Sequence, residues 1–173
     1  MAIPARNSNP IQIVSRVRTF HVTSSTSDKR FLLQSDRAAQ LFLRVLQEYR
    51  EQGRFLLHEF VVMPDHFHVL ITVGADTSVE RAVQFIKGGF AFRAGKELGF
   101  KAPFWQRGFS EVRVPNAQAA SRVCEYIRDN PVVAGMVQQA SDYPYSSAHP
   151  GCALDPLPQG LKPVSHESLL RHG

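Results

Sequence analysis

The sequence has 173 residues, the size of a single domain, of which 43% are hydrophobic and 20% are charged. That composition is typical of a globular protein and excludes an intrinsically disordered chain, and no apolar run approaches the roughly 20 residues of a membrane-spanning helix. Lysine and arginine outnumber the acidic residues by 20 to 15, and the resulting net charge of +5 favours a polyanionic partner. Two cysteines are too few for a disulfide framework, so we expect a cytoplasmic protein.

The first half of the chain predicts a strand, a helix and two further strands. Residues 17–24 are rich in β-branched residues and run into a polar turn, as a strand does. Residues 36–51 place their apolar side chains at helical spacing. The apolar runs 55–63 and 66–73 predict neighbouring strands, which the turn at Pro64 and Asp65 joins as a hairpin.

The second half predicts helix, strand and helix. Ser78 is a suitable N-cap for a helix, although two consecutive glycines inside its apolar pattern argue against an unbroken one. Residues 104–114 predict a strand. A last helix begins after Asn116 and is expected to stop near Asn130, because Pro131 disfavours the helical conformation in the residue before it.

The resulting order, β-α-β-β-α-β-α, predicts an α+β fold. It matches a ferredoxin-like split βαβ sandwich with an antiparallel sheet and one appended C-terminal helix. We expect this domain to span residues 1–148. Prolines and glycines recur from residue 149 on, so residues 149–173 are expected to form a flexible tail.

The segment M-P-D-H-F-H-V-L-I-T, from Met63 to Thr72, contains the most informative pattern in the chain. His66 and His68 are two residues apart on a predicted strand and therefore share a face. Two imidazoles this close can ligate one divalent metal. Taken alone, the same pair is also explained as two polar residues on a solvated face, and the spacing leaves both interpretations open.

A second pattern, E-Y-I-R-D-N-P-V, covers residues 125–132. Tyr126 and Asn130 are four residues apart and lie on one face of the predicted last helix. Taken alone, Tyr126 is most simply an aromatic side chain at the rim of the core, and Asn130 is most simply a residue of a helix end.

Together with F-W-Q-R-G-F at 104–109 and S-D-Y-P-Y-S-S at 141–147, these segments resemble the HUH-type tyrosine transposases, and more narrowly the REP-associated tyrosine transposases of bacteria. The resemblance implies a metal-dependent, single-stranded DNA endonuclease and strand transferase that cuts near DNA hairpins through a 5′-phosphotyrosine intermediate. The resemblance implies that Tyr126 is the nucleophile. It also implies that His66, His68 and Asn130 are ligands of Mg²⁺ or Mn²⁺.

The resemblance also implies a partner, single-stranded DNA with a hairpin such as a REP-like palindrome, and a monomer or a homodimer. Basic residues in the second half of the chain could neutralise the phosphates of that partner, although each of them is most simply a solvated surface charge. The candidate DNA-binding residues are Lys87, Arg93, Lys96, Lys101, Arg107 and Arg113.

Two other functions stay open on the sequence alone. One is a domesticated, inactive relative that binds single-stranded or hairpin DNA without cutting it. The other is an unrelated metal-dependent phosphohydrolase that uses the His-x-His pair. The intact His66, His68 and Tyr126 favour the cutting enzyme over the inactive relative. The remaining histidines are expected to be structural or surface residues, and they are His21, His58, His149, His166 and His172.

Overall fold

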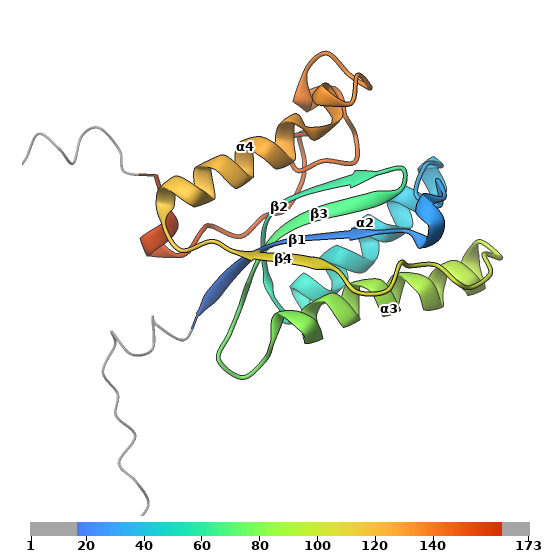
Figure 1. The fold of residues 1–173 in the computed structure, drawn as a ribbon, viewed down its shortest axis with the longest axis horizontal. Coiled ribbons are helices and arrows are strands. Elements are labelled where there is room, and N and C mark those ends of the chain that lie inside the picture. The colour runs from blue at the N-terminus through green and yellow to red at the C-terminus, as the bar shows by residue number, and fades with distance from the viewer. Residues whose placement is uncertain (1–16, 164–173) are drawn as a thin grey trace, which may run out of the picture.

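The computed structural model describes residues 17–163 and contains a four-stranded antiparallel sheet with the strand order β2-β3-β1-β4 (Figure 1). Helices α2 and α3 cover one face of this sheet, and α4 covers the other (Figure 1). The elements are β1 (Arg18–Ser25), α2 (Asp36–Glu51), β2 (Leu56–Met63), β3 (His66–Val73), α3 (Val79–Glu97), β4 (Ser110–Arg113) and α4 (Ala117–Val133). The predicted element order and the α+β fold class are confirmed.

The β2–β3 hairpin is the predicted one, with Met63 opposite His66 across the turn at Pro64 and Asp65. Strand β1 lies between β3 and β4 and is antiparallel to both. The two central strands of the sheet are therefore β3 and β1, each hydrogen-bonded to a neighbour on both sides. Among the helices of residues 17–163, none is long and apolar enough to cross a membrane.

Strand β3 divides its side chains between two apolar cores. Phe67, Val69 and Ile71 are fully buried in the larger core together with side chains of α2 and α3. Leu70 points to the opposite face and packs in a smaller core with Ile127 of α4. Each such buried side chain contributes about 1.5–3 kcal/mol to folding, so the alternation along β3 fixes which of its residues face α4.

Helix α3 is continuous through its two consecutive glycines, Gly88 and Gly89. Its N-cap is Ser78, whose Oγ accepts a hydrogen bond from the backbone N–H of Arg81 at 3.1 Å. A Cβ on Gly89 would lie 2.7 Å from Cε2 of Tyr49 on α2, whereas a Cβ on Gly88 would have no neighbour within 4 Å. Gly89 therefore permits the close approach of α2 and α3.

The predicted strand 104–114 is shorter than expected, since only Ser110–Arg113 pairs with β1 as a strand. Gly108 adopts a φ of +79°, which turns the chain just before β4. Trp105 forms an isolated bridge with Thr26, and its indole packs against the larger core. The aromatic side chains in this segment therefore serve the core.

The predicted end of α4 near Asn130 is wrong, because the helix continues through Pro131 to Val133. Proline removes a single backbone donor, and Pro131 is one of the buried residues of α4. The helix ends instead at Gly135, which has a φ of +74° and donates its N–H to the Val132 carbonyl. The N–H of Met136 bonds to the Pro131 carbonyl at 2.9 Å, so a Schellman motif terminates the helix. Asn130 thus lies inside α4.

The predicted flexible tail also needs correction for residues 149–163. The Asp155 carboxylate accepts hydrogen bonds from the Arg50 side chain, at 3.0 and 2.9 Å, and from the Leu57 backbone N–H at 2.8 Å. Leu161 is buried in the core under α4. These contacts tie the segment to α2 and β2, so the folded domain extends beyond residue 148. The rest of the predicted tail, 164–173, lies outside the described residues.

Candidate active site

The two sequence patterns meet where α4 crosses the sheet. His68 of β3 is buried, with 4% of its surface exposed, while Tyr126 of α4 is 54% exposed. The ring centres of His68 and Tyr126 are 5.4 Å apart, and those of His66 and His68 are 5.1 Å apart. The strand pattern and the helix pattern therefore form one site.

The two nitrogens of His68 face different neighbours. Nδ1 lies 2.9 Å from the Thr23 hydroxyl and 3.0 Å from Nε2 of His21. Nε2 faces the Asn130 amide, whose Nδ2 is 3.3 Å away. A neutral imidazole protonated at Nδ1 satisfies both sides, because it donates toward β1 and keeps its Nε2 lone pair on the α4 side.

The surroundings of His68 keep its imidazole neutral. Burial, and then the positive charges that His66 and His21 would carry, lower the pKa of His68 to about 3. Burial also lowers the pKa of His21. Neutral imidazole is the form of histidine that binds metals, so these surroundings hold His68 in a form suited to ligation.

His21 belongs to this site, although the sequence analysis assigned it no role. Its ring centre lies 5.2 Å from that of His68 and 5.7 Å from that of Tyr126. The antiparallel register pairs Thr23 with His68, so His21 and Thr23 both project from β1 toward the same imidazole. A strand pattern around His21 is visible in the sequence, but its contact with His68 depends on the pairing of β1 with β3.

His66 is oriented by its neighbour in the hairpin turn. Its Nδ1 donates a hydrogen bond to Oδ1 of Asp65 at 2.7 Å, and about a quarter of its side chain is exposed. A carboxylate bonded to Nδ1 fixes the ring and leaves the Nε2 lone pair free, as in many metal-binding histidines.

The donor atoms fit a divalent cation as a partial ligand set. His66 and His68 offer two imidazole nitrogens, and the side chain of Asn130 offers an amide oxygen if it turns about its Cβ–Cγ bond. Within residues 17–163 no group of three His, Cys, Asp or Glu side chains could hold a metal ion. The candidate set therefore consists of two imidazoles and one amide, and it leaves coordination positions for phosphate oxygens.

Tyr126 is the accessible tyrosine at this site. It lines a surface hollow of about 470 Å³ together with Asn130, one helical turn further along α4. By contrast, Tyr143 is buried and donates its hydroxyl to the Val62 carbonyl, while Tyr145 donates to Asp36. Burial raises the pKa of each of these two phenols to about 12. Geometry and accessibility both favour Tyr126 as a nucleophile.

An ion pair between a buried carboxylate of β2 and a half-exposed arginine of α4 joins the helix to the sheet. Glu59 of β2 is 2% exposed and pairs with Arg128 of α4. The Ser147 hydroxyl donates a second hydrogen bond to the same carboxylate. Helix α4 is thereby joined to β2, and β2 to the segment after α4.

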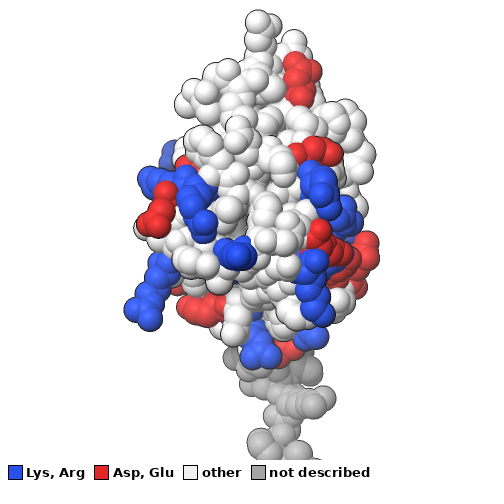
Figure 2. Space-filling view, turned by 90° about the vertical axis from the view of Figure 1, so that its right-hand side faces the viewer, with Lys and Arg blue, Asp and Glu red and all other residues white. Residues whose placement is uncertain are grey.

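Two of the six predicted DNA-binding residues are bonded within the protein. Lys87 donates to the carbonyls of Gln106 and Gly108, and Arg93 pairs with Glu48 and Glu97. In the face shown in Figure 2, acidic side chains are interspersed among the basic ones. The members with exposed side chains are Lys96, Lys101, Arg107 and Arg113.

Known proteins resemble this chain in sequence. The sequence profile of the family described as "Transposase IS200 like" matches residues 15–130, a range that contains both histidines, Tyr126 and Asn130. The REP-associated tyrosine transposase of Escherichia coli K12 is 28% identical over 126 residues, which are 72% of this chain and 70% of the relative. A putative REP-associated tyrosine transposase of Haemophilus influenzae is 28% identical over 98 residues, 51% of this chain and 56% of the relative.

Two solved structures resemble the fold. A REP-associated tyrosine transposase bound to a REP hairpin superposes with a TM-score of 0.64 at 23% identity, over 86% of this chain and 93% of the other. A putative transposase from Deinococcus radiodurans superposes with a TM-score of 0.50 at 19% identity, over 68% and 89% of the two chains. These likenesses support the ferredoxin-like arrangement of the sheet and helices.

Proposed function

Since the chain belongs to the IS200-like transposase family, we propose that it cuts and rejoins single-stranded DNA beside a hairpin through a covalent intermediate on Tyr126. The observation that carries this proposal is the exposed Tyr126 phenol next to the buried His68, with Asn130 one helical turn away. A hairpin partner is supported by the relatives, which are named for REP elements, one of them bound to a REP hairpin.

The proposed reaction exchanges one phosphodiester for another. The Tyr126 oxygen attacks phosphorus, forms a bond to it, and loses its proton to solvent. The bond between phosphorus and the 3′ oxygen breaks, and that oxygen takes up a proton to become a free 3′-OH. The 5′-phosphotyrosine retains the energy of the broken bond, so attack by a 3′-OH rejoins DNA without ATP.

A bound divalent cation, Mg²⁺ or Mn²⁺, would supply charge neutralisation at a non-bridging phosphate oxygen. His66, His68 and Asn130 are the residues that would hold it. Asp65 orients His66. The Nδ1–H of His68 donates its hydrogen bond toward His21 and Thr23, which keeps Nε2 of His68 available. Phenols are weak nucleophiles at neutral pH, and this site compensates by positioning the tyrosine beside the phosphate.

The exposed members of the basic set are proposed to contact the phosphates of the substrate. They are Lys96, Lys101, Arg107 and Arg113. Lys87 and Arg93 are already bonded within the protein, and their substitution would disturb the β4 segment and the α2–α3 interface as well. Single-stranded binding should therefore depend on salt through the exposed members, with a slope of about 0.7 per phosphate contact.

The proposal is tested by trapping the covalent intermediate. Protein is incubated with Mn²⁺ and a DNA hairpin labelled at the 3′ end of its flank, and denaturing electrophoresis separates free DNA from protein-bound label. Wild type should form an adduct and Tyr126→Phe should form none, although it binds the DNA. Tyr145→Phe is the control and should form the adduct. An adduct in Tyr126→Phe would place the nucleophile elsewhere, and DNA binding without any wild-type adduct would favour the inactive relative.

The ligand assignment is tested separately by metal binding. The double variant His66→Ala/His68→Ala should lose Mn²⁺ binding, measured by electron paramagnetic resonance, and should lose nicking while it keeps its DNA affinity. Asn130→Ala should slow nicking without abolishing it, because water can replace a neutral amide oxygen on a hard cation. Wild-type nicking in the double variant would refute the ligand assignment.

A further inference from the structure

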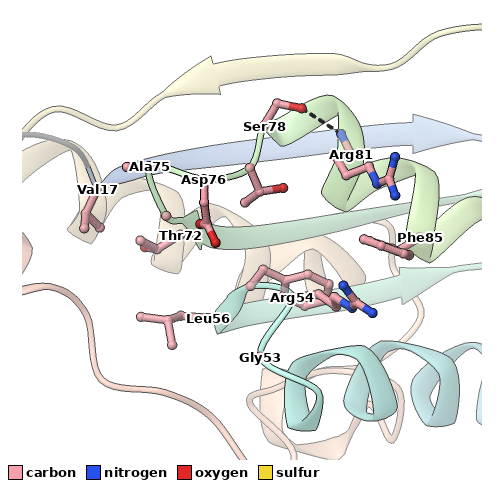
Figure 3. A pocket seen from close by; sticks show the side chains of 13 residues that line it. Val17, Gly53, Arg54, Leu56, Thr72, Ala75, Asp76, Ser78, Arg81 and Phe85 are labelled. Carbon is pink, nitrogen blue, oxygen red and sulfur yellow. Dashed lines mark hydrogen bonds between the residues drawn. The ribbon is translucent and has the colours of Figure 1, made fainter. Parts of the chain in front are cut away.

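A cleft of about 750 Å³ opens at the end of the sheet remote from the histidine pair (Figure 3). Thr72 near the end of β3 and Leu56 at the start of β2 contribute to it, and these two residues are directly opposite each other in the sheet. His66 begins β3 at the other end. The cleft is therefore separate from the site that contains Tyr126.

Two arginines share one aromatic ring in this cleft. The Cζ atoms of Arg54 and Arg81 lie 4.7 and 5.3 Å from the ring centre of Phe85, and both side chains extend toward that ring (Figure 3). Arg54 follows α2 and Arg81 lies in the first turn of α3, so two different elements bring the charges together. The π face partly offsets the repulsion between the two guanidinium groups.

Neither arginine has a carboxylate partner within residues 17–163, where the ion pairs formed by arginine involve Arg50, Arg93 and Arg128. Asp76 also lines the cleft, but it is not within ion-pair distance of Arg54 or Arg81. An anion in the cleft would therefore give these guanidinium groups charge-assisted hydrogen bonds that no side chain of the described protein provides.

We propose that this cleft binds a backbone phosphate of the DNA whose cleavage is assigned to Tyr126, at a second contact away from the cut. This inference rests on the proposed function for its ligand. Arginine suits the role because its planar donors match phosphate oxygens in pairs. Gly74 at the cleft directly follows β3 and lies six positions after His68, a distance along the strand of about 20 Å or roughly six base pairs of duplex. One hairpin with its flank can span both places.

The experiment compares two double variants that lose the same charge. Arg54→Gln/Arg81→Gln alters the cleft, and Arg44→Gln/Lys162→Gln alters exposed positions outside both sites. Affinity for a fluorescein-labelled hairpin with a stem of about 12 base pairs is measured over a range of salt concentrations. The cleft variant should bind more weakly than the control variant. Its plot of log K against log salt should be flatter by about 0.7–0.9, the contribution of the one phosphate contact that is lost.

Two further probes distinguish the sources of phosphate and separate this inference from the cleavage proposal. A hairpin with a stem of about four base pairs should be bound and joined to Tyr126 equally by wild type and cleft variant, because it does not reach the cleft. Inorganic phosphate alone should not bind measurably by calorimetry. Equal salt slopes in both double variants would overturn the inference, as would phosphate binding that the cleft substitutions abolish without any change in DNA slope. A changed slope without any wild-type adduct would refute the cleavage proposal alone.

Discussion

Nε2 of His21 lies 3.0 Å from Nδ1 of His68, so a residue of β1 contacts the buried histidine of the pair on β3. The Thr23 hydroxyl lies 2.9 Å from the same nitrogen, so two side chains of β1 contact the His68 nitrogen that faces away from α4. This arrangement selects the tautomer in which Nε2 of His68 is free for a ligand.

His21→Ala should therefore weaken Mn²⁺ binding by about 10- to 100-fold, the range for a residue that orients a metal ligand. Affinity is measured by titration calorimetry without DNA, so the result does not depend on cleavage. His21→Gln, which keeps an acceptor near Nδ1, should recover part of the affinity. Thr23→Val tests the second neighbour of the same nitrogen. An unchanged affinity in His21→Ala would show that His21 does not orient His68.

The ion pair between Glu59 and Arg128 should contribute to the stability of α4 on the sheet. Arg128→Met leaves a buried carboxylate with Ser147 as its remaining side-chain donor, and should lower the free energy of unfolding by about 1–3 kcal/mol. Urea denaturation followed by circular dichroism gives this value. The loss should be smaller when Arg128→Met is made together with Glu59→Gln, because the stranded charge is then absent. If Arg128→Met lowered the free energy of unfolding equally in wild type and in Glu59→Gln, the two residues would not be coupled. Arg122→Met on the same helix is the control.

Stability should fall as the pH is lowered from about 7 to about 5. His58 is buried against Thr72 and the Asp155 carbonyl, and burial lowers its pKa below 6.5 although Asp155 and Glu59 act in the opposite direction. The unfolded chain titrates near the ordinary value of about 6.5, so below that pH it binds more protons than the folded protein does. His21 and His68 act in the same direction.

The urea midpoint of wild type should accordingly be lower at pH 5 than at pH 7. His58→Gln should reduce stability at pH 7 and should show a smaller difference between the two pH values. Identical pH dependence in the variant and in wild type would mean that His58 does not contribute.

Neighbouring glycines in α3 should respond in opposite ways to alanine. Gly88→Ala meets no atom within 4 Å and should stabilise the helix by about 0.5–1 kcal/mol. Gly89→Ala would bring its Cβ to 2.7 Å from the Tyr49 ring and 3.1 Å from Val45, and should destabilise by about 1–3 kcal/mol. Thermal unfolding of the two single variants measures both effects. Gly89→Ala combined with Tyr49→Leu should regain stability, and a stabilised Gly89→Ala would show that α2 and α3 can separate without cost.

The sequence predicted the elements whose signals are local. Alternation along 66–73 identified β3 and separated its core-facing residues from His66 and His68, because successive side chains of any strand point to opposite faces. The four-residue spacing of Tyr126 and Asn130 likewise placed both on one face of α4. One local signal was misjudged, since Gly135 rather than Pro131 ends that helix.

Only the tertiary structure decided which residues share the site and which charges are free. His21 reaches His68 across 47 residues of sequence because β1 pairs with β3 in one register. Lys87 and Arg93, which were predicted to contact DNA, bind Gly108 and Glu48 instead, and these partners are distant in the sequence. Asp155 of the expected tail likewise binds Arg50. Periodicity follows from the geometry of a single element and is therefore legible in the sequence. The contacts between elements depend on which faces pack together, and that is set by the burial of the whole apolar core.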